Sequence, residues 1–307
     1  MDRGAAAAGK FPHCLMRIKA PAGARDDDAV MPSITLSAGI PPDSPPPRRC
    51  YATTPAVQVF LPKDHGSWSL VLEPLVLGLL AAPSPAGAAL ATAALAGFFA
   101  RRPLKSAFHP DSADRRRMAC KTLVMFSMLA VAGLVEAGLI GGPAALWPLL
   151  FATPLGGLFV CFDAKNGSRA VAAELAGSAA FALVPAALAT LAGWPPSAAL
   201  GLAAVALARS GPTILAVRTY LRLNKQQPVG TFLPLLTGGL AVAGLVFLAA
   251  HQLVPWLAAG FAALLLGRTV LLVSPLRPIW PAKRIGKIEA ILGGLYTGTI
   301  ALAYHLP

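Results

Sequence analysis

The chain has 307 residues, of which 56% are hydrophobic and 13% are charged, and its mean hydropathy is +0.64. A soluble domain carries about 25% charged residues, so this composition excludes an ordinary soluble protein. The formal net charge of +13 would suit a nucleic-acid partner, but the basic residues stand in short segments beside apolar stretches, without interleaved aromatic residues. We therefore expect no nucleic acid, and expect the positive charge to set membrane topology and to attract anionic lipids.

Residues 1–55 differ in composition from the rest of the chain. They are rich in Ala, Gly and Pro, as in PPDSPPPRRC, and include an acidic run from Asp26 to Asp28. They show no sustained hydrophobic period, which predicts a disordered tail. We expect no secretory signal, because no apolar core follows the first basic residues. A start codon assigned too far upstream is an alternative explanation of this segment.

Nine apolar stretches follow, and each is a candidate transmembrane helix. A helix needs about 20 mainly apolar residues to cross the hydrocarbon of a bilayer. The first two stretches are shorter than the others. The nine stretches cover approximately residues 66–82, 86–100, 119–139, 143–162, 171–192, 197–217, 232–251, 255–273 and 286–305. We predict one domain over residues 60–307, an all-α polytopic membrane helix bundle with about nine transmembrane helices.

The basic residues of this domain concentrate in alternate gaps between the stretches. Segment 101–121 holds seven Lys and Arg residues, and the gaps after the fourth, sixth and eighth stretches hold others. The opposite gaps, with the sequences APSPAG, GGP, WPPS and HQLVP, hold none. Lys and Arg are retained in cytoplasmic loops, so an odd number of spans predicts a cytoplasmic N-terminus and an external C-terminus.

The first span contains a carboxylate at Glu73, about two turns from its start. Such a group is costly in a membrane unless it faces the bundle interior and finds a partner or a proton. Helical spacing places His65, Ser69 and Glu73 near one face of the helix. The structural alternative explains only part of this segment, with Asp64 as a helix N-cap and Trp68 at the membrane interface.

Two basic residues, Arg209 and Arg268, stand deep inside apolar stretches and therefore need anionic partners. Glu73, Glu174 and Glu289 are the natural candidates. Glu174 and Glu289 also lie near the basic helix ends, where pairing with a nearby Lys or Arg is the structural alternative. The Ser-Gly-Pro sequence that follows Arg209 predicts a break in the sixth span that exposes backbone groups to a cavity.

The segment Pro62-Lys63-Asp64-His65-Gly66-Ser67-Trp68 resembles the N-terminal signature of the YwiC-like family of bacterial membrane proteins, which is usually Pro-Lys-Glu-His-Gly-Ala-Trp. Similar residues continue at 102–104, 174–177, 217–222 and 284–289, so the resemblance covers residues 60–305. It implies a protein of the bacterial cytoplasmic membrane. The family has no established activity to transfer to this chain.

A more distant similarity is to the UbiA superfamily of membrane prenyltransferases, which also have nine spans and cytoplasmic active-site loops after alternate helices. Those enzymes use two Asp-rich motifs to hold Mg²⁺ against a prenyl diphosphate. Here the first loop offers only Asp111 and Asp114, and the second offers only Asp163. Because one or two carboxylates and phosphate oxygens often suffice for Mg²⁺, this resemblance implies a metal site at Asp111 and Asp114. Mg²⁺ is expected only under this interpretation.

The candidate site combines these observations. The candidates for catalytic or acid–base roles are Asp64, His65, Glu73 and Asp163. The candidates for binding an anionic substrate are Lys63, Arg101, Arg102, Lys105, Arg209 and Arg218. A purely topological role is the alternative for the basic residues at the helix ends.

Three hypotheses about function remain open, and all expect membrane lipids as neighbours. In the first, which the sequence favours over the other two, the protein acts on a prenyl or other lipid diphosphate at the cytoplasmic face. In the second, it is a proton-coupled carrier of a small molecule, with His65 and Glu73 as the proton-sensitive pair. In the third, it is a non-catalytic membrane component, and its buried charges only hold the helices together.

Overall fold

The computed structural model describes residues 65–306, apart from residues 109–111, 166, 168 and 169. The predicted disordered tail at residues 1–55 lies outside the described residues. Within them the structure is all-α, with nine α-helices, one short 3-10 helix and no strand. The elements are α2 (His65–Ala81), α3 (Pro85–Phe108), α4 (Ala113–Gly141), η1 (Pro143–Leu146), α5 (Pro148–Ala164), α6 (Val171–Leu191), α7 (Pro196–Asn224), α8 (Phe232–Ala250), α9 (Trp256–Val273) and α10 (Ala282–Ala303). The predicted all-α fold class is confirmed, and each of the nine predicted stretches forms a helix.

Six of these helical segments are long and apolar enough to cross a membrane by length and composition. They are α4, η1 with α5, α6, α7, α8 and α9. Of the other three, α2 has only 17 residues and therefore extends about 25 Å. Helices α3 and α10 each carry three or more charged residues toward one end. The described part of the chain is thus a multi-pass membrane bundle in which three helices are less apolar or shorter than the rest.

Several helices extend beyond the apolar stretches from which they were predicted. Helix α3 continues to Phe108, α4 begins at Ala113, and α7 continues to Asn224. The extensions contain Lys and Arg, which are good helix formers. The Ser112 side chain caps α4 by accepting a hydrogen bond from the Arg115 backbone N–H at 3.3 Å. These helices therefore carry their charged ends past the apolar part of the bundle.

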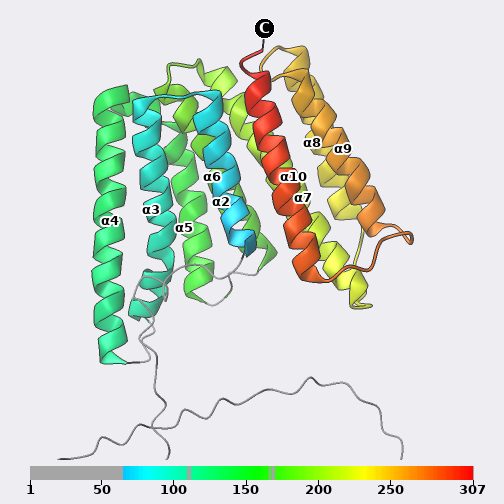
Figure 1. The fold of residues 1–307 in the computed structure, drawn as a ribbon, viewed down its shortest axis with the longest axis horizontal. Helices are drawn as coiled ribbons and strands as arrows, with labels where there is room; N and C mark the ends of the chain where they lie inside the picture. The colour runs from blue at the N-terminus through cyan, green and yellow to red at the C-terminus, as the bar shows by residue number, and fades with distance from the viewer. Residues whose placement is uncertain (1–64, 109–111, 166, 168–169, 307) are drawn as a thin grey trace, which may run out of the picture. The chain divides into compact units, whose positions relative to one another are not determined.

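Small residues allow close packing between the helices. Helix α3 packs on α4, α5 on α6, α6 on α7, and α8 on α9, while α10 packs mainly on α2 (Figure 1). At Gly133 of α4, a Cβ atom would lie 2.7 Å from the carbonyl oxygen of Ala89 on α3. Most residues of the buried core are Ala or Leu. Close backbone approach through small residues is the usual basis of helix association in membranes.

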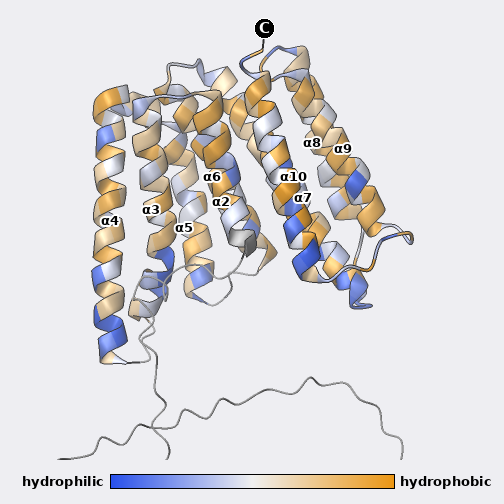
Figure 2. Ribbon diagram, viewed as in Figure 1, coloured by the Kyte–Doolittle hydropathy of each residue, from blue (hydrophilic) through white to orange (hydrophobic). Residues whose placement is uncertain are grey.

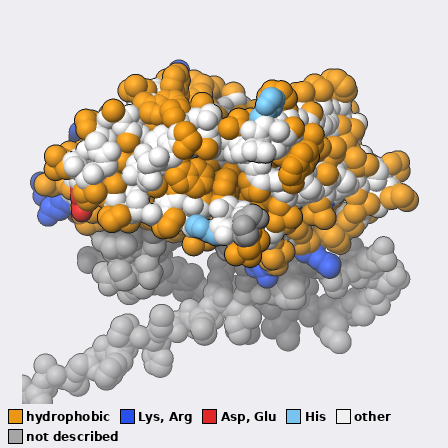
Figure 3. Space-filling model, turned by 90° about the horizontal axis from the view of Figure 1, so that it is seen from above, with side chains coloured by type: hydrophobic (Ala, Val, Ile, Leu, Met, Phe, Trp, Pro, Cys, Tyr) orange, Lys and Arg blue, Asp and Glu red, His pale blue; other side chains and the backbone are white. Residues whose placement is uncertain are grey.

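The hydrophilic residues of the bundle gather at one end. Figure 2 shows them at the lower ends of α3, α4, α5, α7 and α10, which we call the basic end because its Lys and Arg residues outnumber its acids. Seen from the opposite end, the surface consists mainly of hydrophobic and uncharged side chains, with basic side chains only toward its margin (Figure 3). The predicted cytoplasmic location of the basic end stays a prediction.

One prediction about the sixth span is wrong. Helix α7 runs without a break from Pro196 to Asn224, with Pro212 inside it. A proline removes one backbone hydrogen bond, and in membrane helices neighbouring helices and hydroxyl side chains compensate for this loss. Packing against α6, α8 and α9 supports the continuous helix.

Candidate functional site: a buried ionic network

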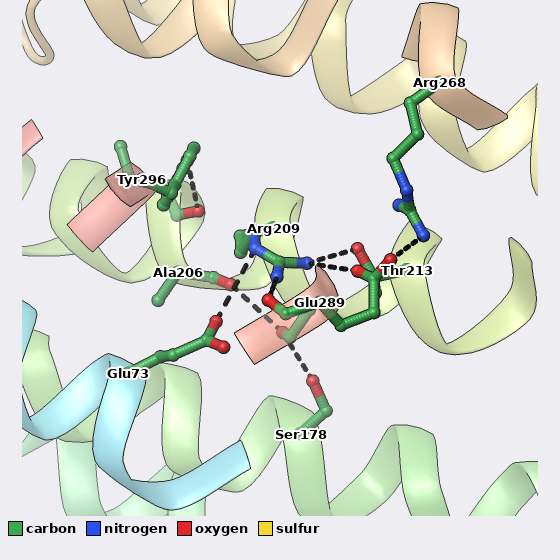
Figure 4. A network of polar contacts seen from close by, with 10 residues as sticks. Glu73, Ser178, Ala206, Arg209, Thr213, Arg268, Glu289 and Tyr296 are labelled. Carbon is green, nitrogen blue, oxygen red and sulfur yellow. Dashed lines mark hydrogen bonds and ion pairs between the residues drawn. The ribbon is translucent and has the colours of Figure 1, made fainter. Parts of the chain in front are cut away.

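Four charged side chains from four helices form a network inside the bundle (Figure 4). Glu73 comes from α2, Arg209 from α7, Arg268 from α9 and Glu289 from α10. Arg209 lies between the two carboxylates: its Nε is 3.6 Å from Glu73 Oε2, and its Nη1 is 3.6 Å from Glu289 Oε2. Arg268 Nη2 pairs with Glu289 Oε1. We call these four residues the buried network.

The network is withdrawn from the surface. The Arg209 side chain is 4% exposed, and the other three side chains are between 12% and 17% exposed. An unpaired charge in such surroundings would be very costly, so opposite charges must lie together. With two cations and two anions, the ionised network has no net charge. This balance explains why a bundle of apolar helices accommodates four ionic side chains.

Arg209 also has neutral partners, which fix its position. Its Nη1 donates to Thr213 Oγ1 at 2.6 Å, one turn further along α7. Its Nη2 donates to the backbone carbonyl oxygen of Glu289 at 2.9 Å. The guanidinium therefore contacts both the backbone and the side chain of α10. It joins α7 directly to α10 and, more loosely, to α2.

The hydrogen bonding of the network is incomplete. Within the described part of the chain, Arg209 Nε, Arg268 Nη1 and Glu289 Oε2 are buried and have no hydrogen-bond partner. A separation of 3.6 Å between Arg209 Nε and Glu73 Oε2 is an ion pair without a hydrogen bond. Most buried polar atoms in proteins are hydrogen-bonded, so these three atoms require an explanation.

The backbone of α10 leaves room for the Glu73 carboxylate at Gly293. A Cβ atom at this glycine would overlap the carboxylate of Glu73. Gly293 lies one turn after Glu289 and therefore on the same face of α10. Ser69 lies near the Glu73 carboxylate, on the same face of α2 as their spacing predicts. Helix α2 therefore approaches α10 closely where the Glu73 carboxylate lies against Gly293.

Hydroxyl groups surround the network on neighbouring turns. Ser178 on α6 and Ser210 on α7 are joined through their hydroxyl oxygens at 2.5 Å. The Tyr296 hydroxyl on α10 donates to the carbonyl oxygen of Val205 at 2.9 Å. These groups extend the polar interior of the bundle from α6 to α10, as Figure 4 shows.

A second ionic cluster lies at the basic end, between α3 and α5. Asp163 on α5 is buried and pairs with Arg101 Nε at 3.2 Å and with Lys105 Nζ at 3.8 Å. The Arg101 guanidinium lies over the rings of Phe98 and Phe159, 5.2 Å and 5.0 Å from their centroids. We call Arg101, Lys105 and Asp163 the rim cluster. Two cations therefore already surround Asp163, which is one of the three carboxylates that the sequence proposed for acid–base chemistry.

A third pair joins α6 to α7. Arg218 Nη1 lies 2.7 Å from Glu174 Oε2, and these side chains are 25% and 33% exposed. Of the three carboxylates proposed as partners for the deep arginines, Glu73 and Glu289 therefore serve that role. Glu174 instead pairs near its helix end, as the structural alternative predicted.

The remaining candidates are placed as follows. Lys63, Asp64, Asp111 and the side chain of His65 lie outside the described residues, although the backbone of His65 begins α2. Arg102 is half-buried near the end of α3, and Asp114 is exposed in the first turn of α4. Among the described residues, no three His, Cys, Asp or Glu side chains are grouped to hold a metal ion. The proposed Mg²⁺ site stays a prediction.

The sequence assignment of the site omitted Arg268, Glu289, Thr213 and Gly293. Arg268 and Glu289 were recognised as charges that need partners, but they were not placed in the site. The signal for Thr213 was its spacing of four residues from Arg209, and Gly293 stands at the same spacing from Glu289. Such spacing identifies a common face of one helix but not the helix that faces it.

The long apolar helices and the buried network between them define the class: this is a multi-pass membrane protein with an ionic centre inside its bundle. Residues 61–189 match the family model described as YwiC-like protein. Over this region the chain is similar to the YwiC-like family, as its N-terminal signature indicated. No curated protein matches the chain. No solved structure matches it either, so the UbiA-like topology stays a prediction.

The family match divides the buried network. Glu73 and the whole rim cluster fall within residues 61–189, whereas Arg209, Arg268 and Glu289 come from helices beyond that range. The part of the chain that matches the family therefore contributes one residue to the network. The C-terminal helices contribute the other three.

Proposed function

We propose that this YwiC-like membrane protein is a proton-coupled carrier in which the buried network binds a proton and an anionic cargo. The observation that carries the proposal is the loose pair between Glu73 and Arg209, in which Arg209 Nε lacks a hydrogen bond. Ionisable residues inside membrane helices commonly mark ion pathways and proton relays. Glu73 is the proposed proton acceptor of this pathway.

The charges of the network suggest how a proton would be coupled to a substrate. When all four side chains are ionised, their charges sum to zero. A proton bound by Glu73 neutralises its carboxylate and leaves the network with one excess positive charge on its guanidinium groups. A small anion near Arg209 would restore neutrality, because Arg209 Nε is still available as a donor. The proposed cargo is therefore a small anion that moves together with a proton.

The geometry favours this function over a purely structural lock. A lock is strongest when its groups form short, complete hydrogen bonds, since a buried ion pair must offset the cost of removing both charges from water. Here Arg209 is well bonded to α10 and only loosely paired with α2. Glu73 is thus the member of the network that can exchange its partner most readily.

A carbodiimide test addresses the protonation of Glu73 without a known cargo. Dicyclohexylcarbodiimide is apolar and reacts with protonated carboxyl groups inside membranes. We expect the purified full chain in liposomes to be modified at Glu73, more strongly at acidic than at alkaline pH, as measured by peptide mass spectrometry. The Glu73→Gln variant should lose this modification. The Glu136→Gln variant should retain it, because Glu136 is exposed on α4 and outside the network. Absence of modification at Glu73 under both conditions would contradict the proposal.

Transport can then be measured directly. Liposomes that contain the protein and a trapped pH indicator would receive a series of small carboxylates and inorganic phosphate. We expect at least one anion to carry protons inward with the wild-type chain but not with Glu73→Gln. If no member of the series moves protons, the carrier proposal is wrong.

The rim cluster favours a second candidate function, which is action on a prenyl or lipid diphosphate. Arg101 and Lys105 on α3 both pair with Asp163 on α5 at the basic end. These two helices precede the two loops in which the resemblance to prenyltransferases places the active site. Guanidinium and ammonium groups are suitable donors for phosphate oxygens. Purified protein should then bind farnesyl diphosphate in the presence of Mg²⁺, and Arg101→Ala should weaken this binding. Failure of the wild-type chain to bind prenyl diphosphates of several lengths would exclude this function.

A further inference from the structure

A groove of about 360 Å³ runs along the outside of the bundle between α7 and α8. Its walls are formed mainly by small or apolar residues, including Ala204, Gly211 and Leu215 on α7 and Gly244 on α8. The lining also includes Leu175 of α6. The groove does not include any residue of the buried network. A ligand of this groove would therefore bind at a site separate from the buried network.

The residues that line the groove have no unpaired side-chain donor that a ligand would need to satisfy. Thr237 is the one hydroxyl residue among the lining residues, and its hydroxyl already donates to the carbonyl oxygen of Leu233 at 2.9 Å. Both α7 and α8 are long and apolar enough to cross a membrane, so the groove opens toward lipid. A hydrocarbon chain satisfies these conditions.

The length of the groove matches one leaflet. From Ala204 to Leu215, α7 advances by about 17 Å at about 1.5 Å per residue. Half of the hydrocarbon core of a bilayer is about 15 Å thick. A transmembrane helix of a partner would continue along the full thickness. The groove therefore suits a lipid chain from one leaflet better than a second helix.

Basic residues continue the groove at the basic end. Arg218 lies three residues after Leu215 and Arg222 lies four residues after Arg218, so the three share one face of α7. Arg218 is paired with Glu174, which is the neighbour of the lining residue Leu175. Arg222 is exposed in the last turn of the helix. The pair and Arg222 together carry one net positive charge at the end of an apolar groove.

We propose that this groove is a binding site for an anionic phospholipid, with one acyl chain between α7 and α8 and the phosphodiester at Arg218 and Arg222. The net charge of Arg218, Arg222 and Glu174 is one positive charge, which matches a phosphodiester that carries one negative charge. The site lies on the leaflet of the basic end.

Native mass spectrometry of the full chain, with added phosphatidylglycerol or phosphatidylcholine of the same acyl composition, tests the site. The wild-type protein should retain phosphatidylglycerol in preference. Gly244→Leu should reduce retention severalfold, because a Cβ atom at Gly244 meets no atom within 4 Å and the new side chain would extend into the groove. Gly239→Leu is the matched control: its Cβ also meets nothing within 4 Å, but Gly239 does not line the groove.

The headgroup contact is tested by Arg222→Gln. One basic residue near an anionic lipid contributes about 1 kcal/mol, which corresponds to about a fivefold change in the preference for phosphatidylglycerol over phosphatidylcholine. Retention of phosphatidylcholine should be unchanged by this variant. Equal retention of both lipids by the wild-type chain would overturn the proposal, as would insensitivity to Gly244→Leu.

Two other results would also overturn it. If farnesyl diphosphate displaces phosphatidylglycerol and Arg222→Gln abolishes that displacement, the occupant is an isoprenoid diphosphate. If Gly244→Leu converts a dimer to a monomer without changing lipid retention, the groove binds a second copy of the chain. Since neither outcome involves Glu73, each is distinguishable from failure of the carrier proposal.

Discussion

The buried network and the rim cluster differ in how many partners each charge has. In the rim cluster, one carboxylate faces two cations, and aromatic rings support Arg101. In the buried network, two guanidiniums and two carboxylates are shared among four helices, and three polar atoms lack hydrogen bonds. The rim cluster lies near a charged helix end, where the Lys105 side chain is 36% exposed, whereas the network lies among apolar turns. Similar residue types therefore surround one carboxylate with cations at the rim and form an incompletely hydrogen-bonded network inside.

The strongest test of this difference is removal of Arg209. In the Arg209→Met variant, Arg268 is the remaining cation of the buried network, and it pairs with Glu289. The buried carboxylate of Glu73 therefore loses its counter-charge. Breaking a buried ion pair by removing one partner costs about 3–5 kcal/mol. We expect a large fall in the midpoint of thermal unfolding in detergent. The Glu73→Gln/Arg209→Met double variant should recover part of the loss, and an unchanged midpoint for Arg209→Met would contradict the buried network.

Gly293→Ala tests the contact between α2 and α10. The added methyl group would overlap the Glu73 carboxylate, and such overpacking typically costs about 1–3 kcal/mol. Gly294→Ala is the matched control, because its Cβ meets no atom within 4 Å. Combining Gly293→Ala with Glu73→Ala should give less than the sum of the two single effects. Equal effects of the two glycine substitutions would show that Glu73 does not lie against Gly293.

Asp163→Asn measures the rim cluster in the same assay. The substitution removes the Asp163 charge that faces Arg101 and Lys105, which lie near the basic end of the bundle. We expect a loss of about 1–2 kcal/mol, less than for Arg209→Met, because hydrogen bonds to charged groups are strong but the Lys105 side chain is 36% exposed and retains access to solvent. A loss as large as that for Arg209→Met would remove the distinction between the two clusters.

The smallest effect is expected for Glu174→Gln. The side chains of Glu174 and its partner Arg218 are 33% and 25% exposed. Exposed ion pairs contribute about 0–1 kcal/mol to the free energy of unfolding. The effect should shrink further at high salt, because screening weakens exposed pairs more than buried ones. A salt-independent loss comparable to that of Asp163→Asn would place this pair with the buried charges.

The sequence by itself determined the helices. In lipid, a polypeptide must satisfy its backbone hydrogen bonds internally, so long apolar stretches become helices whatever their neighbours are. The stretch at residues 232–251, for example, became α8 with bounds Phe232–Ala250. The basic residues in alternate gaps likewise collected at one end of the bundle. The break predicted after Arg209 was wrong. The local sequence shows that a proline removes a backbone hydrogen bond, but it does not show that packing against adjacent helices supports the continuous helix.

The pairing of the buried charges was decided only by the tertiary structure. From the sequence, Glu73, Glu174 and Glu289 were equivalent candidates for Arg209 and Arg268. The choice depended on which helix faces lie together, and in particular on the approach of α2 to α10 at Gly293. A hydrophobic period identifies the faces of one helix, but the partner of each face is set by packing between residues that are far apart in the chain. For the same reason the groove between α7 and α8 had no signal in the sequence.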